Sequence, residues 1–93
     1  MDSLYQILLE IKKRPELHIA KKSLDRLYAF INGYNSYKYD DLLEDFTEYI
    51  KNKYRIDSNN QSWSKIIQFF NTTEEEAFDD FYNKLDDFLN LKS

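Results

Sequence analysis

The segment TEEEAFDDFYNKLDDFLN, residues 73–90, decides the fold class of this chain. Thr73 followed three residues later by Glu76 is a capping box, and acidic side chains at 74–76 favour the positive end of a helix dipole. Apolar positions then recur every three or four residues, at Phe78, Phe81, Tyr82, Leu85, Phe88 and Leu89. The segment therefore predicts a long amphipathic helix that begins at Thr73.

Helical spacing of apolar residues extends over most of the remaining chain. The predicted elements are a helix from Asp2 or Ser3 to the turn at Pro15, a helix after an N-cap at Ser23, a helix over about 40–54, and a short helix after a cap at Ser62. The inward positions that we expect are Leu4, Ile7, Leu8, Ile11, Leu24, Leu27, Tyr28, Ile31, Tyr34, Leu42, Leu43, Phe46, Tyr49, Ile50, Tyr54, Trp63, Ile66, Ile67 and Phe70. Residues 14–22 read either as a short extended piece or as an irregular helical turn, and residues 56–62 read as a loop.

Composition agrees with an all-α fold. One glycine and one proline in 93 residues leave almost none of the turn chemistry that a β-sheet domain needs at each hairpin. Apolar residues make up 42 % of the chain, enough for one core. We expect a single helical domain over residues 1–93, built as a compact bundle of four to five helices.

The residue inventory argues against an enzyme. There is no cysteine, and a single glycine excludes a phosphate-binding loop or a dinucleotide fingerprint. The only histidine, His18, stands between aliphatic residues near Pro15, where we expect it to be partly buried and bonded to backbone. The acidic residues at 40–45 lack the alternating, glycine-turned loop of a calcium site. We therefore expect no catalytic residue, no cofactor and no metal.

Targeting and membrane signals are missing from the pattern of the chain. No apolar run approaches the roughly 20 residues that cross a bilayer. The first residues place acid before the apolar stretch and basic residues after it, the reverse of a secretory signal. We expect a cytoplasmic protein with no membrane partner, as a monomer or a weak homodimer.

Charge is divided unevenly along the sequence. Seven basic and four acidic residues precede Tyr39, a net of +3, whereas six basic and thirteen acidic residues follow from Tyr39 onward, a net of −7. The basic residues around 12–14 and 21–22 could meet phosphate, but cations at a helix C-terminus are favoured for local reasons. Because the later helices are acidic, a basic recognition helix is missing and we expect no nucleic-acid partner.

The acidic residues after position 39 form the candidate binding site. They recur at i, i+4 spacing in the third predicted helix, where each like-charge pair costs roughly 0.2–0.5 kcal/mol. Two tyrosines fall in the predicted loop just before them, and tyrosine is frequent among interface anchors. The candidate partner-binding residues are Tyr37, Tyr39, Asp40, Asp41, Glu44, Asp45 and Glu48. The alternative interpretations are a solvated acidic face that serves solubility and tyrosines that pack locally.

Two segments resemble a family of small bacterial immunity proteins. The string IKKRPELHIAKKSLDRLYAFINGY, residues 11–34, resembles that family's opening, with an Arg-Pro turn and a serine-led helix that ends in Gly-Tyr. The string SWSKIIQFFNTTEEEAFDDFYNKLDDFL, residues 62–89, resembles its second half. His18 and Ala20 depart from the pattern, because they stand where an aromatic residue and a glycine are expected.

The resemblance implies a function in toxin neutralisation. Members of the family occur beside polymorphic toxins and contact-dependent inhibition effectors, and are thought to act as immunity proteins. Their motif residues read as core and caps, so none is carried over as a binding residue, and specificity is expected in the variable stretch at about 35–60. The leading hypothesis is an immunity protein that binds a basic toxin domain, which we expect to be a nuclease, through the acidic, tyrosine-rich residues. The alternatives are a self-associating adaptor domain and an antitoxin-type transcriptional regulator that uses the basic N-terminal patch.

Overall fold

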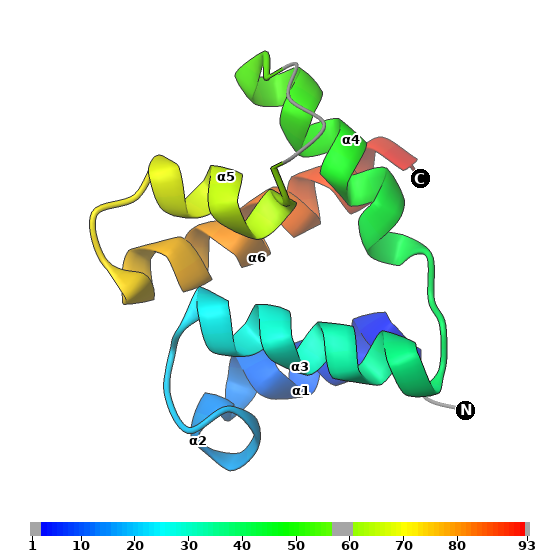
Figure 1. Ribbon diagram of the computed structural model, residues 1–93, viewed down its shortest axis with the longest axis vertical. Helices are drawn as coiled ribbons and strands as arrows, with labels where there is room; N and C mark the ends of the chain where they lie inside the picture. The colour runs from blue at the N-terminus through cyan, green and yellow to red at the C-terminus, as the bar shows by residue number, and fades with distance from the viewer. Residues whose placement is uncertain (1–2, 57–60, 93) are drawn as a thin grey trace.

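Six helices and no strand form within residues 3–56 and 61–92, the part of the chain that the computed structural model describes (Figure 1). The all-α prediction is confirmed, although the expected count of four to five helices is too low by one short helix. The helices are α1 (Leu4–Lys13), α2 (Pro15–His18), α3 (Leu24–Tyr37), α4 (Leu42–Tyr54), α5 (Trp63–Phe69) and α6 (Glu74–Lys92).

Hydroxyl side chains cap the starts of four helices. Ser3, Ser23, Ser62 and Thr73 each accept a hydrogen bond from the backbone N–H three residues further on, at 3.1 to 3.3 Å. Such caps satisfy one of the backbone donors that a helix start leaves unpaired. The predicted caps at Ser23, Ser62 and Thr73 are confirmed, and of the two predicted starts of the first helix the structure has Ser3, because Asp2 lies outside the described residues.

Residues 14–22, for which the sequence allowed either an extended piece or an irregular helical turn, contain the short helix α2. Arg14 has a non-helical backbone (φ −140°, ψ 68°) and ends α1, and Pro15 then occupies the first turn of α2. Pro15 and Ile19 are buried, so the intervening residues face outward and His18 is exposed, with its ring 6.5 Å from that of Phe30. The expectation of a partly buried His18 is therefore wrong. The buried side of this single helical turn carries Pro15 and Ile19, and His18 lies outside it.

Two groups of helices enclose the core. Figure 1 shows α1 and α3 on one side of the molecule and α4, α5 and α6 on the other. Phe46 of α4 lies at the centre, with ring centroids 6.1 Å from Trp63, 5.5 Å from Phe81 and 5.7 Å from Phe88. Aromatic pairs at these separations contribute about 0.5–1.5 kcal/mol each beyond their buried area. This group of rings joins α4, α5 and α6 into one unit.

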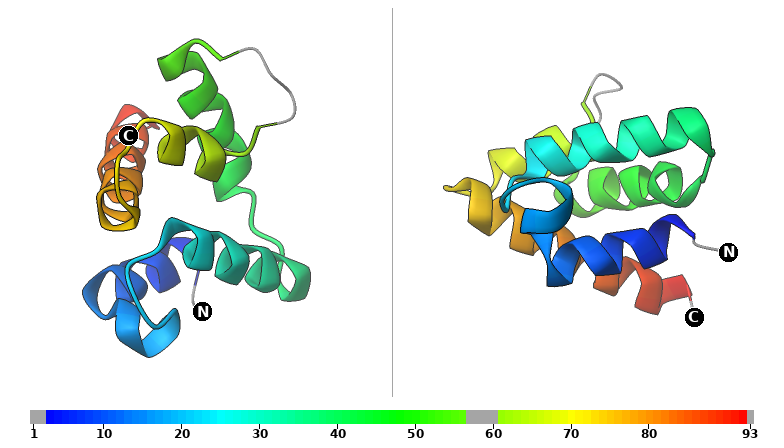
Figure 2. Two further views of the ribbon diagram at one scale, coloured as in Figure 1. Left: turned by 60° about the vertical axis from the view of Figure 1, so that its left-hand side comes forward. Right: turned by 90° about the horizontal axis from the view of Figure 1, so that it is seen from below.

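Helix α1 is held against the C-terminal helix by a buried hydrogen bond. The Tyr82 hydroxyl donates to the backbone carbonyl of Leu8 at 2.6 Å, and Figure 2 shows α1 alongside α6. Burial raises the pKa of the Tyr82 phenol, so this donor keeps its proton. The contact joins residues 74 positions apart and closes the core.

Two expectations about local structure differ from the structure, and a third agrees with it. The third predicted helix begins at Leu42 rather than at about residue 40, so two of the expected like-charge pairs lie partly outside it. Phe70 was expected to point inward, but it is 48 % exposed and stacks on Tyr54. Within the predicted loop 56–62, Ile56, Gln61 and Ser62 lie outside helices as expected, and 57–60 lie outside the described residues.

Candidate protein-binding surface

Four exposed carboxylates gather on the first half of α4 and just before it. Asp41 precedes the helix, and Glu44, Asp45 and Glu48 occupy its first two turns. Acids are favoured at this end by the positive pole of the helix dipole, whose effect fades beyond the first turn. Glu48 lies in the second turn of α4 and pairs with Lys51, with a nitrogen–oxygen distance of 3.7 Å. We call these four residues the acidic surface.

Asp40 has a different position from the other predicted acids. Its carboxylate is half-buried and accepts hydrogen bonds from the backbone N–H of Leu4 at 3.2 Å and of Leu42 at 3.0 Å. One side chain thus binds the first residue of α1 and the first residue of α4. Asp40 positions the acidic surface on the scaffold, and its oxygens are occupied by backbone donors.

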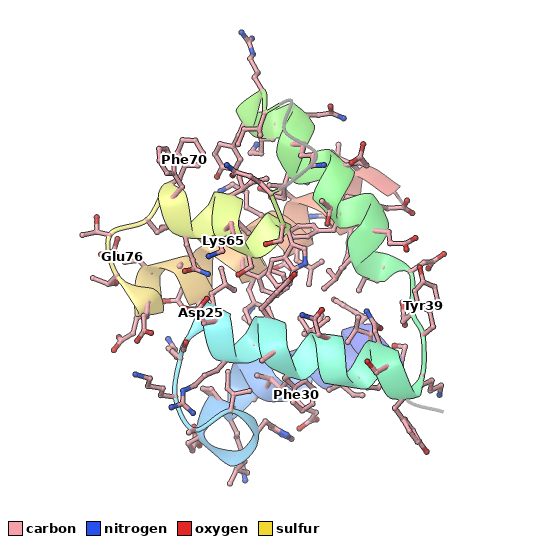
Figure 3. The ribbon with its side chains drawn as sticks, in the orientation of Figure 1. Asp25, Phe30, Tyr39, Lys65, Phe70 and Glu76 are labelled. Carbon is pink, nitrogen blue, oxygen red and sulfur yellow. The ribbon has the colours of Figure 1, made fainter. Side chains whose placement is uncertain are left out.

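The two predicted tyrosines precede the acidic surface along the chain and are largely exposed. Tyr37 is 90 % exposed, but it is the last residue of α3 rather than a loop residue as expected. Tyr39 is 64 % exposed and lies in the connection between α3 and α4 (Figure 3). The Tyr39 hydroxyl donates to the Glu44 carboxylate, and this bond, with the neighbouring acids, raises the pKa of Tyr39 to about 12.

A crevice of about 210 Å³ opens between α3, α4 and the start of α5. Its lining includes the side chains of Tyr28, Asn32, Asn35, Tyr39, Glu44 and Thr47. Two aromatic rings and several oxygen acceptors can together hold a flexible cationic side chain, because the rings cover its aliphatic stem and the oxygens accept from its head. The crevice residues on α3 were missed by the sequence reasoning, although Tyr28, Asn32 and Asn35 follow the i, i+4, i+7 spacing of one helix face.

A larger open groove of about 890 Å³ follows α1 and contains none of the predicted site residues. Its lining includes Glu10 together with Lys12 and Lys13, so the groove carries both negative and positive charges. The geometry and charge of the crevice make it the stronger candidate for a specific contact, despite its smaller volume.

Other charged residues are matched within the fold. Lys21 pairs with Glu74 at 3.2 Å and Lys22 with Asp79 at 3.1 Å, so part of the basic N-terminal patch faces the first turns of α6. Lys84 pairs with Asp80 at 2.7 Å. Burial lowers the pKa of Lys84, but the hydrogen bond and charge of Asp80 outweigh it and the pKa is raised. The acids of α6 are therefore partly neutralised by lysines from elsewhere in the chain and from α6 itself.

Comparisons with known proteins add no assignment. No family model matches the chain, no curated protein matches it, and no solved structure matches it. The resemblance to immunity proteins therefore stays a prediction. Among the described residues, no group of three or more histidine, aspartate or glutamate side chains is arranged to hold a metal ion. In the same residues no helix has the length and apolar character to cross a bilayer.

Proposed function

We propose that this chain is an immunity protein that binds and neutralises a cognate toxin domain, a nuclease, without catalysing a reaction itself. The observation that supports the proposal is the acidic surface with the exposed ring of Tyr39 beside it, and with the exposed Tyr37 two residues earlier in the chain. The sequence resemblance supports the same function independently of this geometry.

The chemistry of a nuclease explains why such a surface would inhibit it. An enzyme that binds phosphates presents a basic cleft, and clustered carboxylates complement that cleft electrostatically. Complementary charge raises association rates about 10- to 1,000-fold, and exposed tyrosines supply rigid apolar area with a polar tip. The crevice beside Tyr39 and Glu44 would accept one lysine or arginine side chain from the partner, which fixes the register of the complex.

The test is binding to the nuclease domain encoded beside the gene for this chain. We expect the two to co-purify, and we expect Asp41→Lys combined with Glu44→Lys to lower the association rate by about 10-fold or more and to flatten its salt dependence. The matched control is Asp86→Lys combined with Asp87→Lys, which reverses two exposed acids of α6. Equal affinities for the wild type and the α4 variant would contradict binding through the acidic surface.

The two alternative functions have separate tests. An antitoxin-type regulator needs the basic N-terminal patch for phosphate, but Lys21 and Lys22 already pair with carboxylates of α6. No binding to duplex DNA at low salt would exclude it, because electrostatic binding is strongest there. A self-associating adaptor predicts a mass that rises with concentration in light scattering, and a strict monomer would exclude that function.

A further inference from the structure

The end of the molecule where α4 and α5 finish carries Phe69, the aromatic side chain with the highest exposed fraction outside the predicted site. Phe69 is 79 % exposed and the adjacent Phe70 is 48 % exposed. Phenylalanine has no polar tip, so both rings present apolar area to water. Exposed apolar residues that cluster rather than scatter mark interaction sites. Figure 3 places Phe70 far from Tyr39, so this end is separate from the acidic surface.

The exposed rings are held in place by contacts beneath them. Phe70 stacks on Tyr54 with centroids 4.3 Å apart and planes 13° apart, and Phe69 meets Phe70 edge-on at 5.2 Å. Lys84 lies 6.0 Å above the centre of the Tyr54 ring and is anchored to Asp80. The aromatic group is therefore pre-organised before any partner binds, which lowers the entropy cost of binding.

Two basic residues stand near these rings along the chain, although the whole chain carries −4. Arg55 directly follows Tyr54 and is exposed, and Lys65 is exposed one helical turn before Phe69 on the same face of α5. Neither cation makes an ion pair with any residue of the described ranges 3–56 and 61–92. We call Tyr54, Arg55, Lys65, Phe69 and Phe70 the aromatic–cationic end.

We infer that the aromatic–cationic end is a second protein-binding surface, whose occupant is an acidic segment with at least one aromatic or long aliphatic side chain. The apolar side chain would pack on Phe69 and Phe70, and the carboxylates would pair with Arg55 and Lys65. An arginine can hold a carboxylate with two parallel hydrogen bonds. This inference does not depend on the toxin partner, because it shares no residue with the acidic surface.

Two other occupants fit the charges less well. A second copy docked by the same end would bring Arg55 and Lys65 against their own equivalents, and like charges in contact oppose binding. A second copy docked by its acidic surface would form a head-to-tail contact, which continues into an open chain unless the rotation closes. Single-stranded nucleic acid also stacks on exposed rings beside cations, but a net charge of −4 opposes phosphate binding.

The experiment is a selection of random peptides displayed on phage, performed on the full chain and on its Phe69→Ser variant. Phe69 is exposed, so we expect this variant to keep the helical circular dichroism of the wild type. Peptides enriched only on the wild type should combine Asp or Glu with aromatic or aliphatic residues. A synthetic peptide from that set should bind about tenfold more weakly to Phe69→Ser and to Lys65→Glu, as measured by fluorescence anisotropy. Leu17→Ser is the matched control, because Leu17 is 65 % exposed on α2, and it should bind like the wild type.

Several results would overturn the inference. Peptides that enrich equally on both proteins, or wild-type-specific peptides that are basic or neutral, would show that this end does not select acidic segments. Binding of a fluorescent oligothymidylate that is lost in Phe69→Ser would assign the surface to nucleic acid instead. A doubled mass in light scattering that Phe69→Ser abolishes would assign it to a second copy. Charge reversal at Asp41 and Glu44 tests the toxin proposal separately and should leave peptide binding unchanged.

Discussion

At the scale of single residues, Ala20 adopts a backbone conformation that favours glycine. Its φ is 76°, in the left-handed region, where a Cβ costs roughly 1–2 kcal/mol. Glycine avoids that cost but loses about 0.5–1 kcal/mol more backbone entropy on folding. We therefore expect Ala20→Gly to raise the free energy of unfolding by up to about 1 kcal/mol in urea denaturation.

The matched control for Ala20 is Ala29, which is exposed within α3. Ala29→Gly should lower the free energy of unfolding by about 1 kcal/mol, because helical backbone gives glycine no steric advantage. If both glycine substitutions destabilise the protein equally, the left-handed conformation of Ala20 carries no strain.

Tyr39 gives a second prediction at this scale, which concerns pH. The protonated phenol donates to Glu44, so the folded state holds the proton more tightly and the pKa is raised to about 12. The contact is intact below the ordinary tyrosine pKa of about 10 and is lost as pH rises through 12. Glu44→Gln removes the charged acceptor and should lower the pKa of Tyr39 toward 10, as followed by NMR of labelled tyrosine. Glu48→Gln, one turn further along α4, should leave it unchanged.

At the scale of helices, the start of α6 depends on one hydroxyl. Thr73 Oγ1 accepts from the backbone N–H of Glu76 at 3.1 Å, and α6 carries a large part of the core. Thr73→Ala should therefore lower the free energy of global unfolding by about 1 kcal/mol. The neighbouring Thr72 is exposed and precedes the cap, so Thr72→Ala should change it by less than about 0.5 kcal/mol. Equal effects of the two substitutions would show that the cap does not stabilise α6.

At the scale of the whole molecule, an ion pair links the connection before α3 to α6. Lys22 and Asp79 lie 3.1 Å apart and both remain accessible to water, so we expect a coupling of about 0.2–1 kcal/mol. Lys22→Glu and Asp79→Lys should each destabilise the protein, and the double variant should recover most of the loss. Urea denaturation at low and high salt measures the coupling, which should weaken as salt rises. Lys22→Glu combined with Asp86→Lys, which does not restore this pair, should show no recovery.

The sequence predicted what local signals determine and missed what depends on distant contacts. The caps at Ser23, Ser62 and Thr73 follow from hydroxyl residues that precede apolar periodicity, and those expectations are confirmed. The side chain of Asp40 could not be distinguished from its acidic neighbours, because its donors at Leu4 and Leu42 are brought together only by the fold. The pairing of Lys21 and Lys22 with α6 is likewise a product of tertiary structure.

The exposure of Phe70 has the same origin. Periodicity put it on the buried face of α5, but that helix ends at Phe69, and the ring turns outward onto Tyr54 of another helix. For the candidate site, the sequence located the acids and tyrosines of one connection and helix start. It could not locate the crevice, because that space exists only once α3 and α4 are packed together.

Trp63 lies where its intrinsic fluorescence can report on both the core and the crevice. It is the sole tryptophan, is 4 % exposed, and lies 4.7 Å from the Phe81 ring and 5.5 Å from the Tyr28 ring. An indole shielded in this way fluoresces at short wavelength and shifts to the red when water reaches it. Trp63 also borders the crevice between α3 and α4. A side chain that enters the crevice would therefore alter the emission intensity of an unlabelled protein, whereas loss of the core would move its wavelength.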